Sequence, residues 1–147
     1  MKHLILTCAI LISVFCKAQE QKLAKNGFPL RATSIAVTST EEKLFALVAS
    51  ILFDNSYEIK FSDKDMGIIQ TDYRSVKGNW KVKFSFSIKD NIVRIQGKSF
   101  TPGLSDSQII NYGMKGSLNL MAFQEMERVA ELIPHSKLEY GFAQSPD

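Results

Sequence analysis

Apolar and polar residues alternate most regularly between residues 80 and 100, and this alternation predicts a β-hairpin. Its first half has apolar side chains at every second position: Trp80, Val82, Phe84, Phe86 and Ile88. Alternate residues of a strand point to opposite faces, so one face is apolar and the other polar. Asp90 and Asn91 suit the left-handed conformations of a two-residue turn. That turn sets a register in which apolar residues meet and Gly97 leaves room for a ring: Ile88 with Val93, Phe86 with Ile95, and Phe84 with Gly97.

Three further stretches also have strand character. Arg31 to Val37 predicts a first strand, and Tyr57, Ile59 and Phe61 alternate with polar residues, as in a strand with one buried face. Residues 63–67 then predict a turn, and Ile68 to Arg74 predicts the returning strand.

The apolar spacing changes to the helical period in two places. The first helix carries Leu44, Phe45, Leu47, Val48, Ile51 and Leu52, and it ends near Asp54-Asn55. Before it, Ser39 stands three residues ahead of Glu42, and Thr38 stands three ahead of Glu41, so a capping box is predicted there. The second helix has an apolar face and ends before Pro134; that face contains Phe123, Met126, Val129, Ala130 and Ile133. Glu125 and Glu127 are assigned to its solvated face.

This order of elements predicts an α+β fold. We expect a two-layer sandwich in which two helices cover one face of an antiparallel sheet of four to five strands, in the order β-α-β-β-β-β-α. A single domain should span residues 31–140. A flexible lead-in over residues 19–30 and a disordered tail over residues 141–147 should flank it.

The first eighteen residues have the three parts of a cleavable secretory signal: basic Lys2, an apolar run from Leu4 to Phe15, and small residues at Cys16 and Ala18. Cleavage after Ala18 would send the protein to the periplasm or out of the cell. Nothing later is apolar for long enough to predict a transmembrane span. The alternative, a lipoprotein anchored through Cys16, is disfavoured by the bulky Phe15 before it.

Removal of the signal changes the composition. The formal net charge of +3 falls to about +1 without Lys2 and Lys17, and this balance does not favour nucleic-acid binding. Both cysteines, Cys8 and Cys16, leave with the signal, so the mature chain is expected to have no disulfide.

The segment from Tyr57 to Ile69, which follows the helix ending near Asn55, resembles a pattern in small exported bacterial domains with a TBP-like (helix-grip) fold. More distantly, it is similar to the repeats of a lipoprotein of the outer-membrane protein assembly machinery. The resemblance covers roughly Ile35 to Ile133. It implies a fold but supplies no catalytic signature.

Candidate catalytic and metal-binding residues are sparse. Asp63-x-Asp65-x-Gly67 fails as a calcium loop, since the sixth and twelfth positions hold Ile68 and Arg74, and it is better explained as a turn. The mature chain has one histidine, His135, just past the second helix, where its charge would favour the helix dipole. We therefore expect no enzyme activity, no cofactor and no metal.

Two features could bind a partner. In the predicted hairpin register Lys83 faces Lys98 and Ser87 faces Arg94, so a cationic strip could meet an anionic partner. Alternatively, this is an ordinary solvated face, partly neutralised by Glu58 and Asp72.

The second feature is the long loop from Thr101 to Ser117, where Leu104, Ile109 and Tyr112 could contact a partner. The same residues could instead pack on the sheet edge as an ordered Ω-loop. The expected function is a non-enzymatic protein-interaction module of the cell envelope. The alternative is a small-molecule or lipid carrier whose pocket lies between helices and sheet, lined by aromatic residues such as Phe84 and Phe123.

Overall fold

A computed structural model describes Leu23 and residues 27–143 of the chain. The predicted signal, with Cys16, Ala18 and its cleavage site, lies outside the described residues, as do residues 144–147 of the predicted tail. Part of the predicted lead-in is described and packs on the domain. The Phe28 ring stacks on Tyr140 with centroids 5.8 Å apart, and the Pro29 carbonyl accepts a hydrogen bond from the Asn111 side chain.

The predicted hairpin is confirmed and forms the centre of the sheet. Strands β5 (Trp80–Lys89) and β6 (Ile92–Phe100) pair in the expected register, with Phe84 opposite Gly97 and Lys83 opposite Lys98. Asp90 and Asn91 have φ of 49° and 62°. Both central residues of the turn are therefore left-handed, and this matches the twist of the flanking strands.

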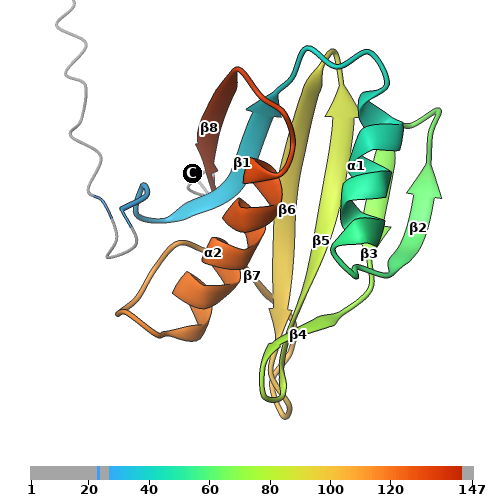
Figure 1. The fold of residues 1–147 in the computed structure, drawn as a ribbon. Coiled ribbons are helices and arrows are strands. Elements are labelled where there is room, and N and C mark those ends of the chain that lie inside the picture. The colour runs from blue at the N-terminus through green and yellow to red at the C-terminus, as the bar shows by residue number, and fades with distance from the viewer. Residues whose placement is uncertain (1–22, 24–26, 144–147) are drawn as a thin grey trace, which may run out of the picture.

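Around this hairpin the chain forms an open antiparallel sheet whose main order is β2-β3-β5-β6-β1-β8 (Figure 1). The other strands are β1 (Ala32–Thr38), β2 (Ile59–Asp63), β3 (Ile68–Thr71), β4 (Arg74–Lys77), β7 (Ser107–Gln108) and β8 (Lys137–Phe142). Strand β4 pairs with β5 beyond the end of β3, and β7 pairs with β6 beyond the end of β1. The prediction of four to five strands was wrong, because the described residues form a sheet of eight strands.

Strand β8 is the element that the sequence pattern missed. It pairs with β1 over six positions, from Ala32–Phe142 to Thr38–Lys137, so the sheet extends beyond residue 140. The apolar–polar alternation of β8 is short and is interrupted by Gly141, so the strand is hard to predict from the sequence. Leu138 and Tyr140 nevertheless alternate toward the core. The observed order is β-α-β-β-β-β-β-β-α-β.

The part of the chain that the structure describes contains two helices, α1 (Leu44–Asp54) and α2 (Leu118–Glu131). The predicted capping box is wrong, since α1 begins at Leu44, with Lys43 at its N-cap and no side-chain cap. The reason is that Thr38 is still part of β1, and the Ser39 amide donates to the Asn91 carbonyl. Among the described residues, no helix is long and apolar enough to cross a membrane.

Both helices lie on the same face of the sheet (Figure 1). One apolar core joins Leu52 of α1 and Phe123 of α2 to Phe84, Phe86 and Ile95 of the central hairpin. The predicted core face of α2 is confirmed, since Phe123, Met126, Val129, Ala130 and Ile133 are at most 1 % exposed. Burial of the four larger of these side chains is worth about 1.5–3 kcal/mol each before conformational entropy is subtracted.

The edge strand β2 departs from its predicted pattern. A β-bulge shifts the register, so that Ile59 pairs with Thr71 while Phe61 pairs with Gln70. The extra residue, Lys60, turns Phe61 to the face opposite the helices. Phe61 is therefore 48 % exposed, and the predicted single buried face of this strand was wrong.

Candidate functional site

The face of the sheet opposite the helices is the candidate site, and we call it the open face. Because residues that pair across antiparallel strands point to the same side, the strand registers place its side chains in lateral rows. The middle row runs from Phe61 through Gln70, Ser85 and Gln96 to Ser34. Amide and hydroxyl groups therefore run across four adjacent strands, β3, β5, β6 and β1.

Two charged rows flank the middle row. On one side Lys83 pairs with Lys98, and Lys98 pairs with Gln108 of β7. On the other side Ser87 pairs with Arg94, and the row continues to Ala36 and Glu139. The predicted cationic residues Lys83, Arg94 and Lys98 thus share one face, as the register indicated.

A hollow of about 340 Å³ opens where the lysine row meets the middle row. Its lining is Gln70, Lys83, Ser85, Gln96, Gly97, Lys98 and Gln108. The hollow offers amide, hydroxyl and ammonium groups, and Gly97, whose Cα hydrogens replace a side chain on the core side, contributes only backbone to its lining.

Asp106, which the sequence reasoning did not single out, is an acid that lies beside Lys83 of the lysine pair. Its carboxylate lies 3.1 Å from the Lys83 ammonium and accepts a hydrogen bond from the Tyr73 hydroxyl. The Lys83 ammonium also lies over the Tyr73 ring, 4.4 Å from its centroid. The hydrogen bonds from Tyr73 and then Lys83 hold the pKa of Asp106 below its usual value, and Lys98 acts in the same direction. Asp106 therefore takes the neutralising role that had been assigned to Glu58 and Asp72.

An irregularity in the sheet directs Tyr73 to this place. Strand β3 stops at Thr71, whose hydroxyl accepts the Phe84 amide at 2.9 Å in place of a backbone carbonyl. The Asp72 carboxylate then accepts the Tyr73 amide at 2.7 Å before β4 resumes pairing. Breaks of this kind re-aim a side chain. A single sequence gives little signal for this break, since Ile68 to Arg74 reads as one strand.

The long loop has a double role. Ile109 is completely buried and its amide donates to the Gly97 carbonyl, while the Asn111 amide donates to Ala32. This part of the loop packs on the sheet, in agreement with the ordered alternative, and Ile109 cannot contact a partner. Leu104 and Tyr112 are 67 % and 52 % exposed, and Arg31 lies over the Tyr112 ring.

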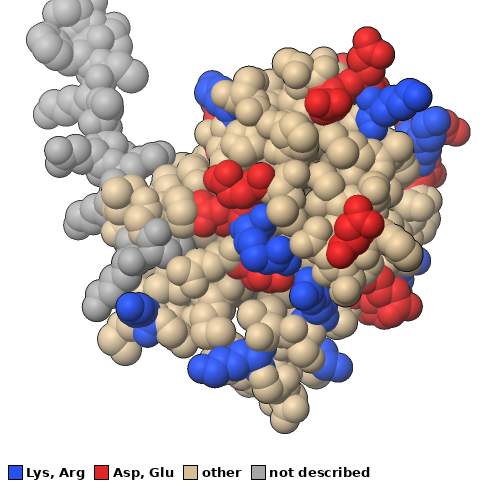
Figure 2. All heavy atoms as spheres, in the orientation of Figure 1, with Lys and Arg blue, Asp and Glu red and all other residues tan. Residues whose placement is uncertain are grey.

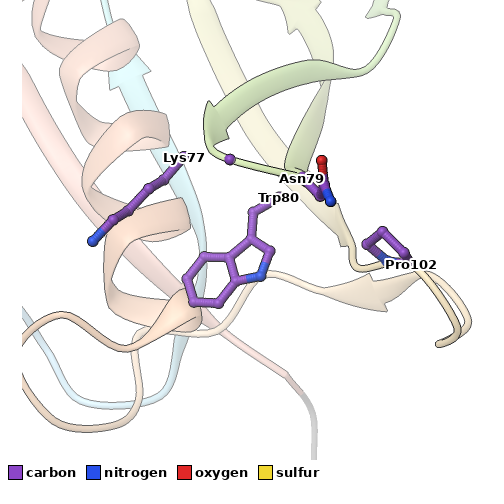
Figure 3. A pocket seen from close by; sticks show the side chains of 5 residues that line it. Lys77, Asn79, Trp80 and Pro102 are labelled. Carbon is purple, nitrogen blue, oxygen red and sulfur yellow. The ribbon is translucent and has the colours of Figure 1, made fainter.

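A second hollow, of about 600 Å³, lies at the β4–β5 turn and is lined by Lys77, Gly78, Asn79, Trp80 and Pro102 (Figure 3). The Lys77 and Trp80 side chains both extend toward the helix side, while the Asn79 amide points away from them (Figure 3). Because these groups do not converge on one position, we do not take this hollow as the site.

Three of the aromatic rings that could line a carrier pocket are part of the core. Phe84, Phe86 and Phe123 are at most 1 % exposed. His135, the remaining candidate for chemistry, lies beyond α2 with Nδ1 2.7 Å from the Ile133 carbonyl and Nε2 3.7 Å from Glu131. It is not on the open face.

The charges distinguish the two faces of the molecule. The helix side carries interspersed acidic and basic side chains (Figure 2). The strand registers place six basic residues on the open face, Lys81, Lys83, Lys89, Arg94, Lys98 and Lys137. The acidic residues on this face include Asp63, Glu139 and Asp106.

Comparison with protein-family models and with curated proteins finds no match for this chain. Its function therefore has to be argued from the chemistry of the open face.

Proposed function

We propose that this chain is a non-enzymatic binding domain whose open face holds a segment of a partner protein in the cell envelope. One observation carries the proposal: the helices cover one face of the sheet, and the other presents hydrogen-bonding side chains between two rows that contain cations. The envelope location comes from the predicted secretory signal. The two helices on one face are also the arrangement that the resemblance to helix-grip domains implies.

The extent of the open face favours a macromolecule. Strands lie about 4.8 Å apart, so the six strands of the main order span roughly 24 Å. This width, together with the surrounding cations, suits an extended polypeptide better than a ligand confined to the hollow.

The side chains of the open face support binding rather than catalysis. Ser85 is its central hydroxyl, and its neighbours in the row are Gln70 and Gln96. A serine nucleophile needs an adjacent base to remove its proton, and a side-chain amide cannot do this. Lys83 stays protonated, because its hydrogen bonds with Tyr73 and Asp106 raise its pKa. The same amides can donate and accept hydrogen bonds with a peptide backbone.

The proposal is tested by site-specific photo-crosslinking of the full chain in the cells that produce it. A photoreactive residue at Ser85 or Gln96, both exposed on the open face, is compared with one at Ser50, which is exposed on α1. We expect the same partner protein to be captured from both positions on the open face and not from Ser50. Capture should fall about tenfold when Lys98→Glu is added, because that charge lies beside the contact.

Two outcomes would reject the proposal. One is capture that does not favour the open face, either equal from Ser50 and Ser85 or absent at Ser85 and Gln96, and the other is capture that is insensitive to Lys98→Glu. Circular dichroism of the purified variants checks that each one keeps its fold.

A further inference from the structure

We infer that the open face recognises a carboxylate side chain of its partner, and that Asp106 occupies this carboxylate site in the unbound protein. The inference rests on the proposed function and adds the chemical class of the recognised group. It assigns Asp106 the role of an internal competitor that an acidic segment of the partner displaces.

The first reason is the pairing of two lysines. Lys83 and Lys98 are directly opposite on β5 and β6, and like charges in such a pair repel each other over about 5 Å. An anion beside both ammonium groups removes this repulsion. In the described structure Asp106 is the anion at this pair: its carboxylate lies 3.1 Å from the Lys83 ammonium, and the charge of Lys98 helps to lower its pKa.

The second reason is that the Asp106 contact can open at little cost. Asp106 follows the exposed turn at the tip of the β6–β7 connection, where the Leu104 amide donates to Thr101 and the Leu104 side chain is 67 % exposed. The side chains of Lys83 and Asp106 each keep 33 % of their surface exposed. Water screens an ion pair of this kind, so it contributes little to folding.

The base of the β6–β7 connection, in contrast to its exposed tip, is held by contacts with the sheet and the core. The Ser99 and Ser107 hydroxyls are 3.0 Å apart, β7 pairs with β6, and Ile109 is buried in the core. Displacement of Asp106 therefore needs a change in its own side chain or in the tip before it, while the pairing of β7 with β6 stays in place.

The surroundings of Asp106 indicate a carboxylate on an extended peptide. The site offers one hydroxyl from Tyr73 and the Lys83 ammonium, and these two groups already hold one carboxylate. Directly beside it, the row Gln70–Ser85–Gln96 provides side chains for the backbone of a peptide that carries the carboxylate. In an extended peptide alternate side chains share one side, so acids at every second position would all face the lysine row.

The test measures fluorescence anisotropy of a fluorescein-labelled peptide of alternating Glu and Ser, titrated with the full chain. The matched probe is the same peptide with Gln in place of Glu. We expect Asp106→Asn to bind the Glu peptide roughly three- to tenfold more tightly than the wild type, because the competing anion is gone. Binding of the Gln peptide should not change. Lys98→Gln should weaken binding of the Glu peptide, and raised ionic strength should weaken it too.

Glu42→Gln is the matched control, since it makes the same change in net charge at an exposed residue before α1. Asp106→Ser serves as a second variant if Asp106→Asn does not fold. The inference is overturned if Asp106→Asn leaves affinity for the Glu peptide unchanged or lowers it. It is also overturned if both peptides gain equally, or if Glu42→Gln has the same effect.

The two proposals fail separately. A partner captured at Ser85 and lost with Lys98→Glu, together with no gain from Asp106→Asn, would keep the binding domain and reject Asp106 as a competitor. Absence of capture from the open face would reject the binding domain itself, whatever the peptides show.

Discussion

Glu127 is a carboxylate in an unusual environment, since it lies on α2 and is only 7 % exposed. The Tyr140 hydroxyl on β8 donates a hydrogen bond to it at 2.9 Å. Burial raises the pKa of Glu127 to about 7, against the opposing effect of the Tyr140 hydrogen bond, and the nearby Glu131 raises it further. The sequence had placed Glu127 on a solvated helix face, and this was wrong because the missed strand β8 covers it.

This environment predicts a pH-dependent stability. An acid whose pKa is higher in the folded than in the unfolded chain stabilises the fold below the unfolded pKa, and this contribution is lost as pH rises through the folded pKa. The free energy of unfolding should therefore fall between about pH 5 and about pH 8, by on the order of 1 to 3 kcal/mol. Urea denaturation across this range measures it.

Glu127→Gln separates this residue from all other titrating groups. Its amide oxygen can still accept the Tyr140 hydrogen bond but cannot ionise. The variant should lose most of the slope and be more stable than the wild type at the upper end of the range. An unchanged slope would assign the pH dependence to other residues.

At the scale of elements, β5, β6 and the long loop meet at Gly97. A Cβ atom at this position would lie 2.5 Å from Cδ1 of Ile109 and 2.9 Å from Cδ1 of Phe84. The expected room for the Phe84 ring is thus confirmed, and the loop uses the same space. Glycine here lets Ile109 anchor the loop in the core.

Gly97→Ala should therefore destabilise the fold by about 1 to 3 kcal/mol through overpacking. Ile109→Val removes the Cδ1 atom that the new methyl group would meet first, so the cost of Gly97→Ala should be smaller in that background. Denaturation of the two single variants and the double variant gives the coupling energy. Ser85→Ala, on the open face of β5, is the control. Strictly additive effects would show that the loop does not press on Gly97.

At the scale of the whole molecule, a polar network joins elements that are distant in sequence. Glu125 on α2 accepts hydrogen bonds from Tyr57, just before β2, and from Arg128, and it lies 3.7 Å from Arg74 of β4. Arg128 also reaches Asn55 at the end of α1. Burial and the hydrogen bond to Glu125 raise the pKa of Tyr57. Burial alone would raise the pKa of Glu125, but the hydrogen bonds from Arg128 and Tyr57 hold it below its usual value.

Glu125→Gln should cost about 1 to 3 kcal/mol of stability, because it weakens contacts to several partly buried groups at once. In a double-mutant cycle with Arg128→Met we expect a coupling energy of about 0.5 to 3 kcal/mol. Glu131→Gln is the matched control, since its side chain is 55 % exposed on the same helix. Equal effects of Glu125→Gln and Glu131→Gln in urea denaturation would show that the network does not stabilise the contact between the helices.

Local periodicity in the sequence is enough to predict several parts of this protein. The β5–β6 register, its turn at Asp90–Asn91 and the buried face of α2 follow from spacing alone, because each residue's environment is set by near neighbours in the chain. The placement of Lys83, Arg94 and Lys98 on one face follows from the same register.

The tertiary structure decided what depends on contacts between distant segments. The pairing of β8 with β1, the bulge that exposes Phe61 and the burial of Ile109 and Glu127 all require partners far along the chain. The meeting of Asp106 with Tyr73 and Lys83 is of the same kind. No local pattern encodes such contacts, because their energy is realised only when the sheet has assembled.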